Sequence, residues 1–500
     1  MERQQEYVLR TIEDKGVRFV RLWFTDVVGQ LKSVAIAPAE LEEAFEEGIG
    51  FDGSSIQGMT RVYEDDMTVR PDAETFSILP WRGEDVPVAR MFCDVLTRDN
   101  EPVRSDPRSI LRRTLDKAAD MGFTCFVHPE VEFYLFHPEN DPNKEPVPID
   151  NASYFDHVTR SLAQNFRRDA ILTLEDMGIS VEFSHHEAGP GQNEIDLRYT
   201  DALRMADNVM TLKTVVEQIA IEQGVHASFM PKPLVNSPGN GMHTHFSLFE
   251  GDKPAFHDAT GPGGLSRTGQ KFLAGLLRHA REITAVTNQY VNSYKRLYSG
   301  DEAPSYVYWG PYSRSALVRV PAHSPNKPQS ARIEYRALDS AANPYLAFAV
   351  VLRAGLRGIE RDYDLPVAVE TDVALMSDLE REISGIEGLP SSLGEAVELM
   401  KSSELVAETL GEDCFDYFLR DKRHEWNVYH RQVTPHERGF FRPTEHPCAN
   451  SPFPLACAKP VSRRWRKPNS SSKNAHERAS PHHESKLSPR RRTRISVCSC

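Results

Sequence analysis

The sequence has few cysteines, and their positions suggest no disulfide framework. Only Cys93, Cys125 and Cys414 precede residue 440, and they are scattered without the paired spacing of a zinc knuckle. The chain also lacks a run of about 18 apolar residues, the length that a membrane-spanning helix needs. Its first residues are polar, unlike the apolar core of a signal peptide. We therefore expect a cytoplasmic protein in a reducing compartment, with no membrane partner.

Glycine-rich motifs that cradle phosphates are missing as well. Neither G-x-x-x-x-G-K before Ser or Thr nor G-x-G-x-x-G occurs, and the glycines of residues 261–264 have no lysine beside them. This argues against a P-loop and against a dinucleotide-binding fold. A nucleotide could instead be held by arginines, whose forked guanidinium groups match phosphate oxygens. Five of them lie within about forty residues: Arg296, Arg314, Arg319, Arg332 and Arg336.

The formal net charge of −13 is unevenly distributed along the chain. Residues 451–500 hold twelve Lys and Arg against two Glu, a charge of +10, which leaves −23 for the first 450 residues. Because the body is acidic, nucleic-acid binding is not expected to be its main function. The basic end shows no apolar periodicity, and we predict that residues 442–500 form a disordered tail.

Charged residues stand at every second position in four short stretches, and this is the period of a β-strand. Successive side chains of a strand point to opposite faces, so each stretch gathers its charged groups on one face. A solvated strand face is one explanation. A polar cavity that holds metal ions and an anionic substrate explains better why Glu, His and Arg recur together. The stretches are residues 130–132, 194–198, 243–245 and 332–336.

A predicted tight turn, Ala-Gly-Pro-Gly at residues 188–191, brings Glu187 and Glu194 to one place. With the other stretches this makes five glutamates and one histidine, an oxygen-rich donor set that suits Mg²⁺ or Mn²⁺ better than zinc. Two divalent cations would neutralise most of the negative charge and could bridge a phosphoryl group in transfer. The candidate ligands are Glu130, Glu132, Glu187, Glu194, His243 and Glu334.

The order of predicted elements indicates an α+β fold with two domains. Residues 1–102 form a small unit, with helices at 3–15 and 38–47 and strands at 17–26 and 31–36. Asp106 and Pro107 supply the N-cap and first residue of a helix that opens the second domain, residues 103–441. Strands are expected there at 123–136, 179–187, 194–199, 225–231, 242–249 and 332–336, and helices at 158–177, 201–223, 266–291, 343–360 and 413–428.

Six motifs between residues 5 and 440 match a known family in composition and in order. They are Phe51-Asp52-Gly53-Ser54-Ser55, Glu130-Val131-Glu132, His185-His186-Glu187 through Glu194, Gly241-Met242-His243-Thr244-His245, Asn-Ser-Tyr-Lys-Arg-Leu at residues 292–297, and Asn343-Pro344-Tyr345-Leu346. On these motifs the chain resembles type I glutamine synthetase. The resemblance implies an N-terminal β-grasp domain, then a catalytic domain with a curved antiparallel sheet and flanking helices. It also implies a homo-oligomer, a dodecamer of two hexameric rings with active sites between neighbouring subunits.

The resemblance assigns a role to each charged residue. Glu132, Glu187 and Glu194 would hold one divalent metal ion, and Glu130, His243 and Glu334 the other. ATP would be bound by Glu182, His245, Ser247, Arg314, Arg319 and Arg332. Glutamate would be bound by Arg296, Arg336, the backbone at Gly239, and Glu302 on a flap. The residues implied in catalysis are Asp52, Ser55, Tyr154, Glu302 and Arg314.

The reaction that the resemblance implies has two steps. The γ-carboxylate of glutamate attacks the γ-phosphate of ATP to give γ-glutamyl phosphate, and an amine then displaces phosphate. Asp52 and Ser55 of a neighbouring subunit, with Tyr154 and Glu187, would form the ammonium pocket, in which Asp52 accepts a proton. Read without the resemblance, Asp52 has an alternative role as the side chain of an Asx turn. We expect an ATP-dependent ligase that makes glutamine.

Three places depart from the family pattern. Pro238 stands where the family usually has an asparagine that contacts glutamate, so a side-chain hydrogen bond is lost there. Ala374 stands about where adenylylated members carry the modified tyrosine, so adenylylation is not expected. The segment 433–441 begins like the family's ring-stacking end but continues into the basic tail.

Three alternative functions are weighed against glutamine synthesis. A γ-glutamylpolyamine synthetase would join putrescine or spermine to the same activated carboxylate, because an anionic pocket also attracts polyamines. A catalytically weak nitrogen-sensing homologue would be expected to have broken metal ligands, whereas all six are intact. A metal-dependent hydrolase would not need the five arginines.

Overall fold

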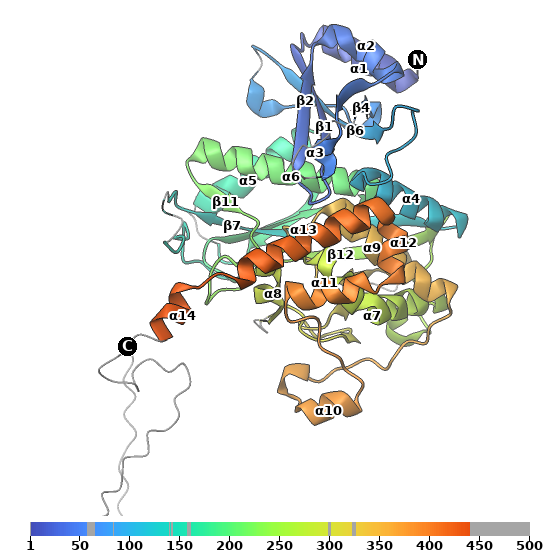
Figure 1. The fold of residues 1–500 in the computed structure, drawn as a ribbon, viewed down its shortest axis with the longest axis vertical. Coiled ribbons are helices and arrows are strands. Elements are labelled where there is room, and N and C mark those ends of the chain that lie inside the picture. The colour runs from blue at the N-terminus through green and yellow to red at the C-terminus, as the bar shows by residue number, and fades with distance from the viewer. Residues whose placement is uncertain are drawn as a thin grey trace, which may run out of the picture. The chain divides into compact units, whose positions relative to one another are not determined.

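The computed structural model describes residues 2–57, 66–83, 85–139, 141, 144–157, 162–298, 302–322 and 327–440. Residues up to Gln432 belong to one compact unit, and residues from Val433 onward belong to a second. In the second unit the structure describes residues 433–440, with helix α14 (Pro435–Phe440). The predicted basic tail, residues 442–500, lies outside the described residues. Figure 1 shows the elements in chain order.

The first sheet of the larger unit has the strand order β2-β1-β6-β4-β3, with β5 paired to β6. β1 and β6 run parallel, and the other pairs are antiparallel. β6 is almost entirely buried because its sequence is mostly apolar. Helices α1 (Arg3–Asp14) and α2 (Leu41–Glu46) bury their apolar residues in the same core. The strands are β1 (Phe19–Thr25), β2 (Leu31–Ile36), β3 (Ile49–Asp52), β4 (Asp66–Pro71), β5 (Ser77–Ile78) and β6 (Val88–Leu96).

The second sheet is larger and curved, in the order β14-β15-β16-β12-β7-β9-β8. Its pairs are antiparallel except β14 with β15. The short strands β10 and β11 pair with β7, and β13 pairs with β12. The strands are β7 (Thr124–Phe136), β8 (Val181–His186), β9 (Gln192–Leu197), β10 (Thr200–Asp201), β11 (His226–Ser228), β12 (Met242–Glu250), β13 (Lys253–Pro254), β14 (Trp309–Gly310), β15 (Val318–Arg319) and β16 (Ile333–Tyr335).

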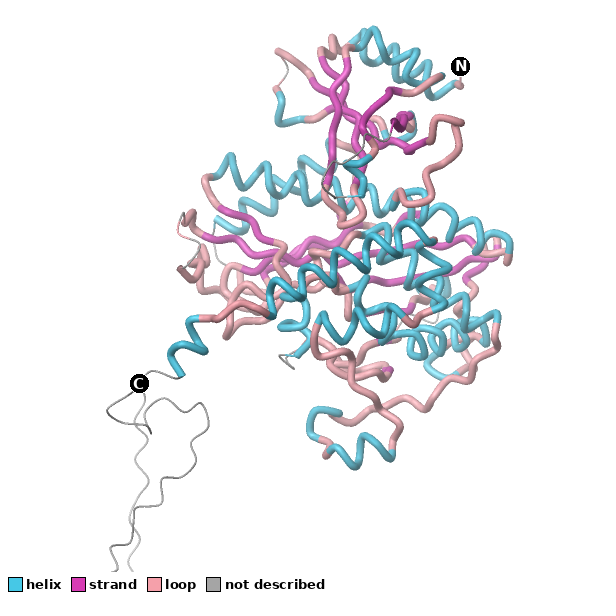
Figure 2. Tube along the Cα trace, in the orientation of Figure 1, coloured by secondary structure: helices cyan, strands magenta, loops and turns pink. Residues whose placement is uncertain are grey.

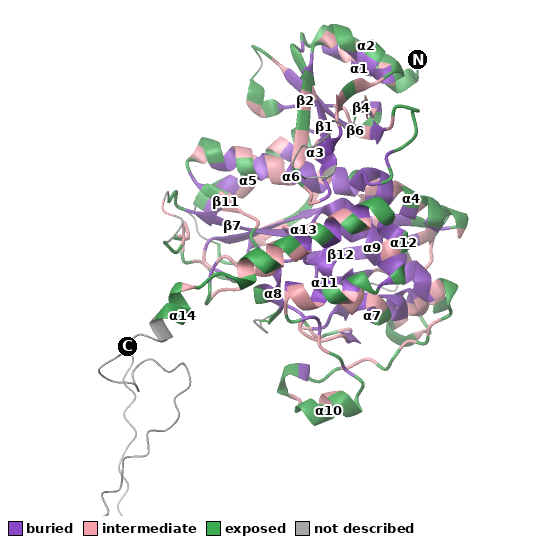
Figure 3. Cartoon of the chain, viewed as in Figure 1, coloured by how far each residue is buried: buried purple, intermediate pink, exposed green. Residues whose placement is uncertain are grey.

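Helices lie beside the strands of the second sheet, as Figure 2 shows with helices in cyan and strands in magenta. Helix α9 is the central one, since fifteen of its seventeen residues are buried, and Figure 3 shows the buried residues gathered on α9 and β12. Side chains cap several helix starts, and Asp201, Ser266 and Asn343 accept backbone hydrogen bonds there, as does the predicted N-cap Asp106. The helices are α3 (Ser54–Gln57), α4 (Pro107–Asp120), α5 (Leu162–Asp176), α6 (Ala202–Gln223), α7 (Arg267–Thr287), α8 (Val291–Tyr298), α9 (Pro344–Glu360), α10 (Asp378–Ile383), α11 (Leu393–Lys401), α12 (Glu404–Leu410) and α13 (Glu412–His430).

The observed elements confirm the predicted α+β class, while the exact domain limits stay a prediction. The predicted helix at 201–223 is α6, and the predicted strand at 123–136 is β7. Residues 158–161 of the predicted helix 158–177 lie outside the described residues. In the part of the chain that the structure describes, no helix is long and apolar enough to cross a membrane.

A buried arginine joins the first sheet to the helices of the second. The guanidinium group of Arg108, on α4, contacts Asp72 at 2.7 Å, Asp94 at 2.5 Å and Asp207 at 3.0 Å. Arg108 is 4% exposed, so water does not screen these ion pairs. Asp72 follows β4, Asp94 lies on β6 and Asp207 on α6, so one side chain ties three elements together.

We predict that Arg108→Ala lowers the free energy of unfolding by about 3–5 kcal/mol, because it removes the buried cation that Asp72 and Asp207 share, while Asp94 keeps its pair with Arg112. Arg112→Ala is the matched control: Arg112 makes two 2.9 Å bonds to Asp94 but its side chain is 42% exposed, so the loss should stay within about 1 kcal/mol. Urea unfolding of both variants measures the difference. Equal losses would show that Arg108 does not join the elements as described.

Candidate functional site

Four neighbouring strands carry the charged stretches, and their register gathers the charges on one face. Glu132 on β7 lies opposite Glu194 on β9, while on β12 His243 lies opposite Glu130. On the other side of β12, His245 lies opposite Glu334 of β16. The alternating residues Val131, Ile195 and Ile333 are fully buried. The period-two pattern in the sequence is therefore a strand pattern, and the charged groups lie together on the opposite face.

Four of these side chains, Glu130, Glu132, Glu194 and His243, line a cavity of about 240 Å³, called here the acidic cavity. It includes most of the residues that the sequence singled out. The lining residues are Glu130, Glu132, Tyr154, Phe155, Phe183, His185, Glu187, Glu194, Asp196, His243, Glu302, Arg314, Arg319 and Arg336.

Three donors on one side of the acidic cavity are close enough to share a cation. His185 Nε2 lies 3.0 Å from Glu194 Oε1, and its Nδ1 lies 3.5 Å from Glu187 Oε1. One donor atom from each of these residues lies within 4.8 Å of the others. Oxygen donors with one imidazole suit Mg²⁺ or Mn²⁺, so the donors present fit such an ion.

The electrostatics of this side point the same way. Burial, reinforced by the nearby charge of Glu132, raises the pKa of Glu187 to about 8 and the pKa of Glu194 well above its ordinary value. Burial and Glu194 raise the pKa of Asp196 to about 10. The raised values mark a surplus of negative charge, which a divalent cation would neutralise.

On the other side of the acidic cavity the protein supplies positive charge itself. Glu334 is fully buried, and its two oxygens lie 2.5 Å from Arg319 Nε and 2.5 Å from a guanidinium nitrogen of Arg336. Glu130 Oε1 lies 2.7 Å from His245 Nε2, and Oε2 lies 3.3 Å from His243 Nδ1. Burial alone would raise the pKa of both carboxyl groups. His245 and Arg336 outweigh burial at Glu334, and His245 and His243 outweigh it at Glu130, so the pKa of each carboxyl group is lowered.

The second group of donors that could hold a cation consists of Glu130, His245 and Glu334. The sequence suggested His243 in this group, and His243 also faces Glu130, so two imidazoles are within reach where one was expected. Glu132 contributes an oriented carboxylate, since its Oε2 accepts hydrogen bonds from Gly241 N at 2.8 Å and Gln192 Nε2 at 3.0 Å. The division of six ligands into two trios stays a prediction.

Three residues form the outer rim of the acidic cavity. The guanidinium group of Arg314 lies 5.5 Å from the ring centre of Tyr154 and donates a 2.9 Å hydrogen bond to Glu302. The side chains of Arg314 and Glu302 are both more than half exposed. Tyr154 also contacts Phe155 and His185, with ring centres 4.0 Å and 5.4 Å away. The exposed pair of Arg314 and Glu302 suits a part of the site that opens for a substrate.

The predicted glutamate-binding residues lie in and beside the acidic cavity. Arg336 and Glu302 line it. Arg296 is buried next to it, where it donates to Ala337 O at 2.8 Å and approaches His243 Nε2 at 3.4 Å. A Cβ at Gly239 would come within 2.8 Å of Arg296 Cγ, so glycine lets this loop pack on the arginine.

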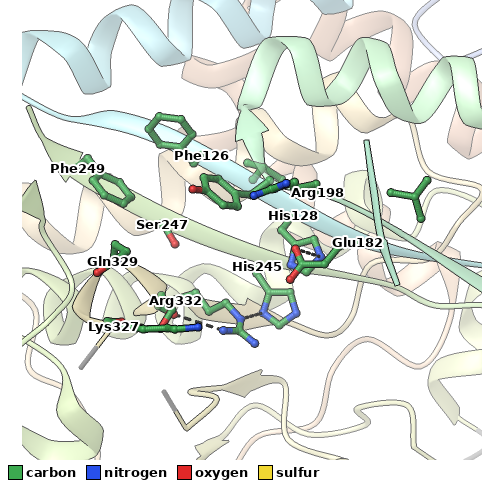
Figure 4. Close-up of a pocket in the computed structure, with 14 residues that line it drawn as sticks. Phe126, His128, Glu182, Arg198, His245, Ser247, Phe249, Lys327, Gln329 and Arg332 are labelled. Atoms are coloured by element: carbon green, nitrogen blue, oxygen red, sulfur yellow. Dashed lines mark hydrogen bonds and ion pairs between the residues drawn. The ribbon is translucent and has the colours of Figure 1, made fainter. Parts of the chain in front are cut away.

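A second cavity, of about 480 Å³, adjoins the acidic one along the same strands. Figure 4 shows Phe126 and Phe249 at one end and His128, Glu182 and His245 at the other. The two cavities meet at His245, which lines the second and contacts Glu130 of the first. Its lining residues are Phe126, Val127, His128, Val181, Glu182, Arg198, Tyr199, His245, Ser247, Phe249, Lys327, Gln329, Ser330 and Arg332.

The predicted ATP-binding residues divide between the two cavities. Four of them, Glu182, His245, Ser247 and Arg332, line the second cavity, whereas Arg314 and Arg319 line the acidic one. Arg332 Nε donates a 3.2 Å hydrogen bond to His245 Nδ1. On the other side of the same ring, Nε2 lies 2.7 Å from Glu130 Oε1.

Two residues of the site were not among the predicted ligands, although the period-two rule relates each of them to a predicted ligand. Asp196 stood within the charged stretch 194–198, but no role was predicted for it. Asp196 lies two positions after Glu194 and His128 two before Glu130, so both share a face with a recognised glutamate. Burial and neighbouring His245 lower the pKa of His128 to about 4, so its ring is neutral at pH 7. Tyr199 and Phe249 carried no such signal, because isolated aromatic residues are ordinary core residues.

Asp52 lies on the first sheet and Ser55 on α3, and neither lines either cavity in the part of the chain that the structure describes. Asp52 ends β3, and its Oδ1 accepts a 3.1 Å hydrogen bond from Ser54 N, which is the Asx turn that the sequence allowed. Ser55 Oγ donates to Asp52 O at 3.0 Å. The predicted role of these residues in the site of a neighbouring subunit stays a prediction.

The chain matches family models over most of its length. A model described as "Glutamine synthetase, catalytic domain" matches residues 104–441, and one described as "Glutamine synthetase, beta-Grasp domain" matches residues 16–98. A curated relative from Mycolicibacterium smegmatis, named glutamine synthetase, is 59% identical over 439 residues, which cover 87% of this chain and 98% of its own. One of the same name from Methanosarcina mazei is 47% identical over 433 residues, 87% of this chain and 96% of its own.

Solved structures agree with this assignment. "Apo GmaS without ligand" aligns with a TM-score of 0.76 at 32% identity, covering 86% of this chain and 98% of that one. A glutamine synthetase from Plasmodium falciparum aligns with a TM-score of 0.79 at 23% identity, covering 88% and 98%, and shows the shared fold. The predicted β-grasp domain and catalytic sheet are thereby confirmed.

The raised pKa of Glu187 makes metal binding depend on pH. Below about pH 8 this carboxyl is protonated in the metal-free protein, whereas a metal ion binds the carboxylate. We therefore predict that Mn²⁺ binding releases protons at pH 7 and that affinity rises about tenfold per pH unit between pH 6 and 8 for each proton released. Calorimetry in two buffers of different ionisation enthalpy measures the number of protons released and the affinity for Mn²⁺. The Glu187→Gln variant should release fewer protons when it binds Mn²⁺. A pH-independent affinity would contradict the assignment.

Proposed function

Because the chain belongs to the glutamine synthetase family and is a ligase, we propose that it joins ammonium to the γ-carboxylate of glutamate with ATP as the energy source. One observation carries the proposal: a cavity suited to a nucleotide meets, at the His245–Glu130 hydrogen bond, a cavity built for cations and carboxylates. This junction is where a γ-phosphate would be handed to a carboxylate.

The acidic cavity would hold two divalent ions, Mg²⁺ or Mn²⁺. We assign Glu132, Glu187 and Glu194 to one ion and Glu130, His243 and Glu334 to the other, with His185 and His245 close enough to orient or share them. When bound, such ions neutralise the phosphate oxygens and draw charge from the transferred group. The donor set and the raised pKa of Glu187 and Glu194 support this assignment.

The arginines of the acidic cavity would orient the transfer. Arg319 and Arg336 are held at fixed positions by the buried carboxylate of Glu334, so their free N–H groups need little reorganisation to meet phosphate or substrate oxygens. Arg336 and Arg296 would grip glutamate, and Arg314 at the rim would close over the γ-phosphoryl group. A carboxylate does not react with an amine until its oxygen has become part of a phosphate leaving group, so the site must activate glutamate before the amine attacks.

The amine would enter next to Tyr154 and Glu187. Asp52 and Ser55 of a neighbouring subunit would complete this pocket, where Asp52 favours the ammonium cation and then accepts its proton. Because neither residue lines a cavity of its own copy, the proposal requires an oligomer, and we propose the family's dodecamer of two hexameric rings. We also propose that the enzyme works in the cytoplasm.

The identity of the amine is the main question that an assay should answer. We predict that phosphate release from ATP requires glutamate, a divalent cation and an amine together, and that ammonium supports the highest rate. Parallel assays with ammonium, putrescine and spermine measure this directly. A faster rate with either polyamine would replace the proposal with γ-glutamylpolyamine synthesis, and activity in EDTA would contradict the metal assignment.

Asp52→Ala tests the amine pocket separately from the phosphoryl site. Removing a general base slows its step by about a hundredfold or more, so turnover with ammonium should fall by that factor while ATP binding is kept. Asp66→Ala is the matched control, since Asp66 lies directly opposite Asp52 on β4 but pairs with Arg98 at the surface. Equal rates for the two variants would exclude Asp52 as the base.

A further inference from the structure

A buried histidine in the second cavity has a ring nitrogen with no hydrogen-bond partner. His128 Nε2 is inaccessible to solvent and, among the described residues, makes no hydrogen bond. The nearest opposite charge is Glu182 Oε2 at 4.0 Å, which exceeds hydrogen-bond distance by about 1 Å. A buried polar atom without a partner costs stability. This one sits where a small movement of Glu182 would satisfy it.

Glu182 is placed for such a movement. The pairing of β8 with β9 shifts register between Val181 and Phe183, which makes Glu182 the extra residue of a β-bulge. Bulges beside functional sites re-aim a side chain. Its side chain is 55% exposed and lines the second cavity, so the carboxylate can swing toward His128 or toward a ligand.

The cross-strand pairs of β7 and β12 show which part of a nucleotide would lie there. They form three rows along the second cavity, starting at the acidic cavity: Glu130 with His243, His128 with His245, and Phe126 with Ser247. Successive rows are about 7 Å apart, two residues along a strand. If the terminal phosphate meets the first row, the base lies near Phe126 and Phe249, whose ring centres are 5.2 Å apart.

The sugar of the nucleotide then lies between the terminal phosphate and the base, beside Glu182. A carboxylate repels phosphates, so Glu182 must face an uncharged donor, and ribose hydroxyls are the donors at that position. We propose that His128 is a positioning residue, which donates from Nε2 to Glu182 and so holds its carboxylate as acceptor for the ribose hydroxyls of the bound nucleotide. Because His128 Nε2 is covered, it acts through Glu182 and not by touching the nucleotide. The inference rests on the proposed use of ATP.

Two variants separate this role from simple packing, since the His128 ring also stacks on His245 with centroids 5.1 Å apart. His128→Gln keeps a donor at nearly the same reach but removes the ring. His128→Phe keeps a ring but removes the donor. If the donor matters, H128F should raise the KM for ATP about tenfold, the size of one charge-assisted hydrogen bond, while H128Q stays close to the wild type. The KM for glutamate should not change in either variant.

Deoxynucleotides supply a readout that packing alone would not move. The wild type should discriminate against 2′-deoxy-ATP or 3′-deoxy-ATP about tenfold relative to ATP. H128F and Glu182→Gln should both reduce this ratio toward one, and the double variant should be no worse than E182Q, because both changes break one interaction. His279→Ala, which removes a histidine that lines neither cavity, should keep the wild-type ratio.

The outcomes distinguish the inference from the function on which it rests. If H128F binds ATP and discriminates like the wild type, or if H128Q is the impaired variant, His128 acts through packing and the inference is wrong. If the wild type does not bind ATP with Mg²⁺ in direct calorimetry, the proposed function fails as well. H128A replaces H128F in the same assays if H128F melts at a lower temperature than the wild type.

Discussion

Repulsion between buried carboxylates is the constraint on which the site depends. The pairing of β7 with β9 sets Glu132 opposite Glu194 and Glu130 opposite Asp196, and like charges directly opposite one another destabilise a sheet. On one side the protein resolves the conflict with His243, His245, Arg319 and Arg336. On the other side it does not, and the pKa of Glu187 rises to about 8.

This asymmetry explains how one cavity could serve two substrates. Glu334 with its two arginines is rigid, so guanidinium groups face incoming oxygens without rearrangement. The side with surplus negative charge would attract cations, first a metal ion and later an ammonium ion. The Arg314 and Glu302 side chains at the rim are more than half exposed, an arrangement that would let the proposed site admit glutamate and then exclude water from the activated intermediate.

Much of this site could be predicted from the sequence, because strand periodicity is a local property. Glu130 and Glu132 needed only the alternation of charged and apolar residues, and the family motifs supplied their partners. What could not be predicted depends on register and on bulges. Nothing local shows that His128 lies opposite His245, or that a bulge turns Glu182 into the second cavity. Among the described residues, Asp52 lines neither cavity, and this too follows from the fold.

The central claim is that the γ-carboxylate of glutamate takes the γ-phosphoryl group of ATP before the amine attacks. Glutamate labelled with ¹⁸O in its γ-carboxylate tests this most directly, with mass spectrometry of the phosphate released in the presence of ammonium. The account predicts one ¹⁸O atom in each phosphate, because the carboxylate oxygen leaves with the phosphoryl group. Phosphate without the label would show that water attacks ATP instead, and would contradict the account.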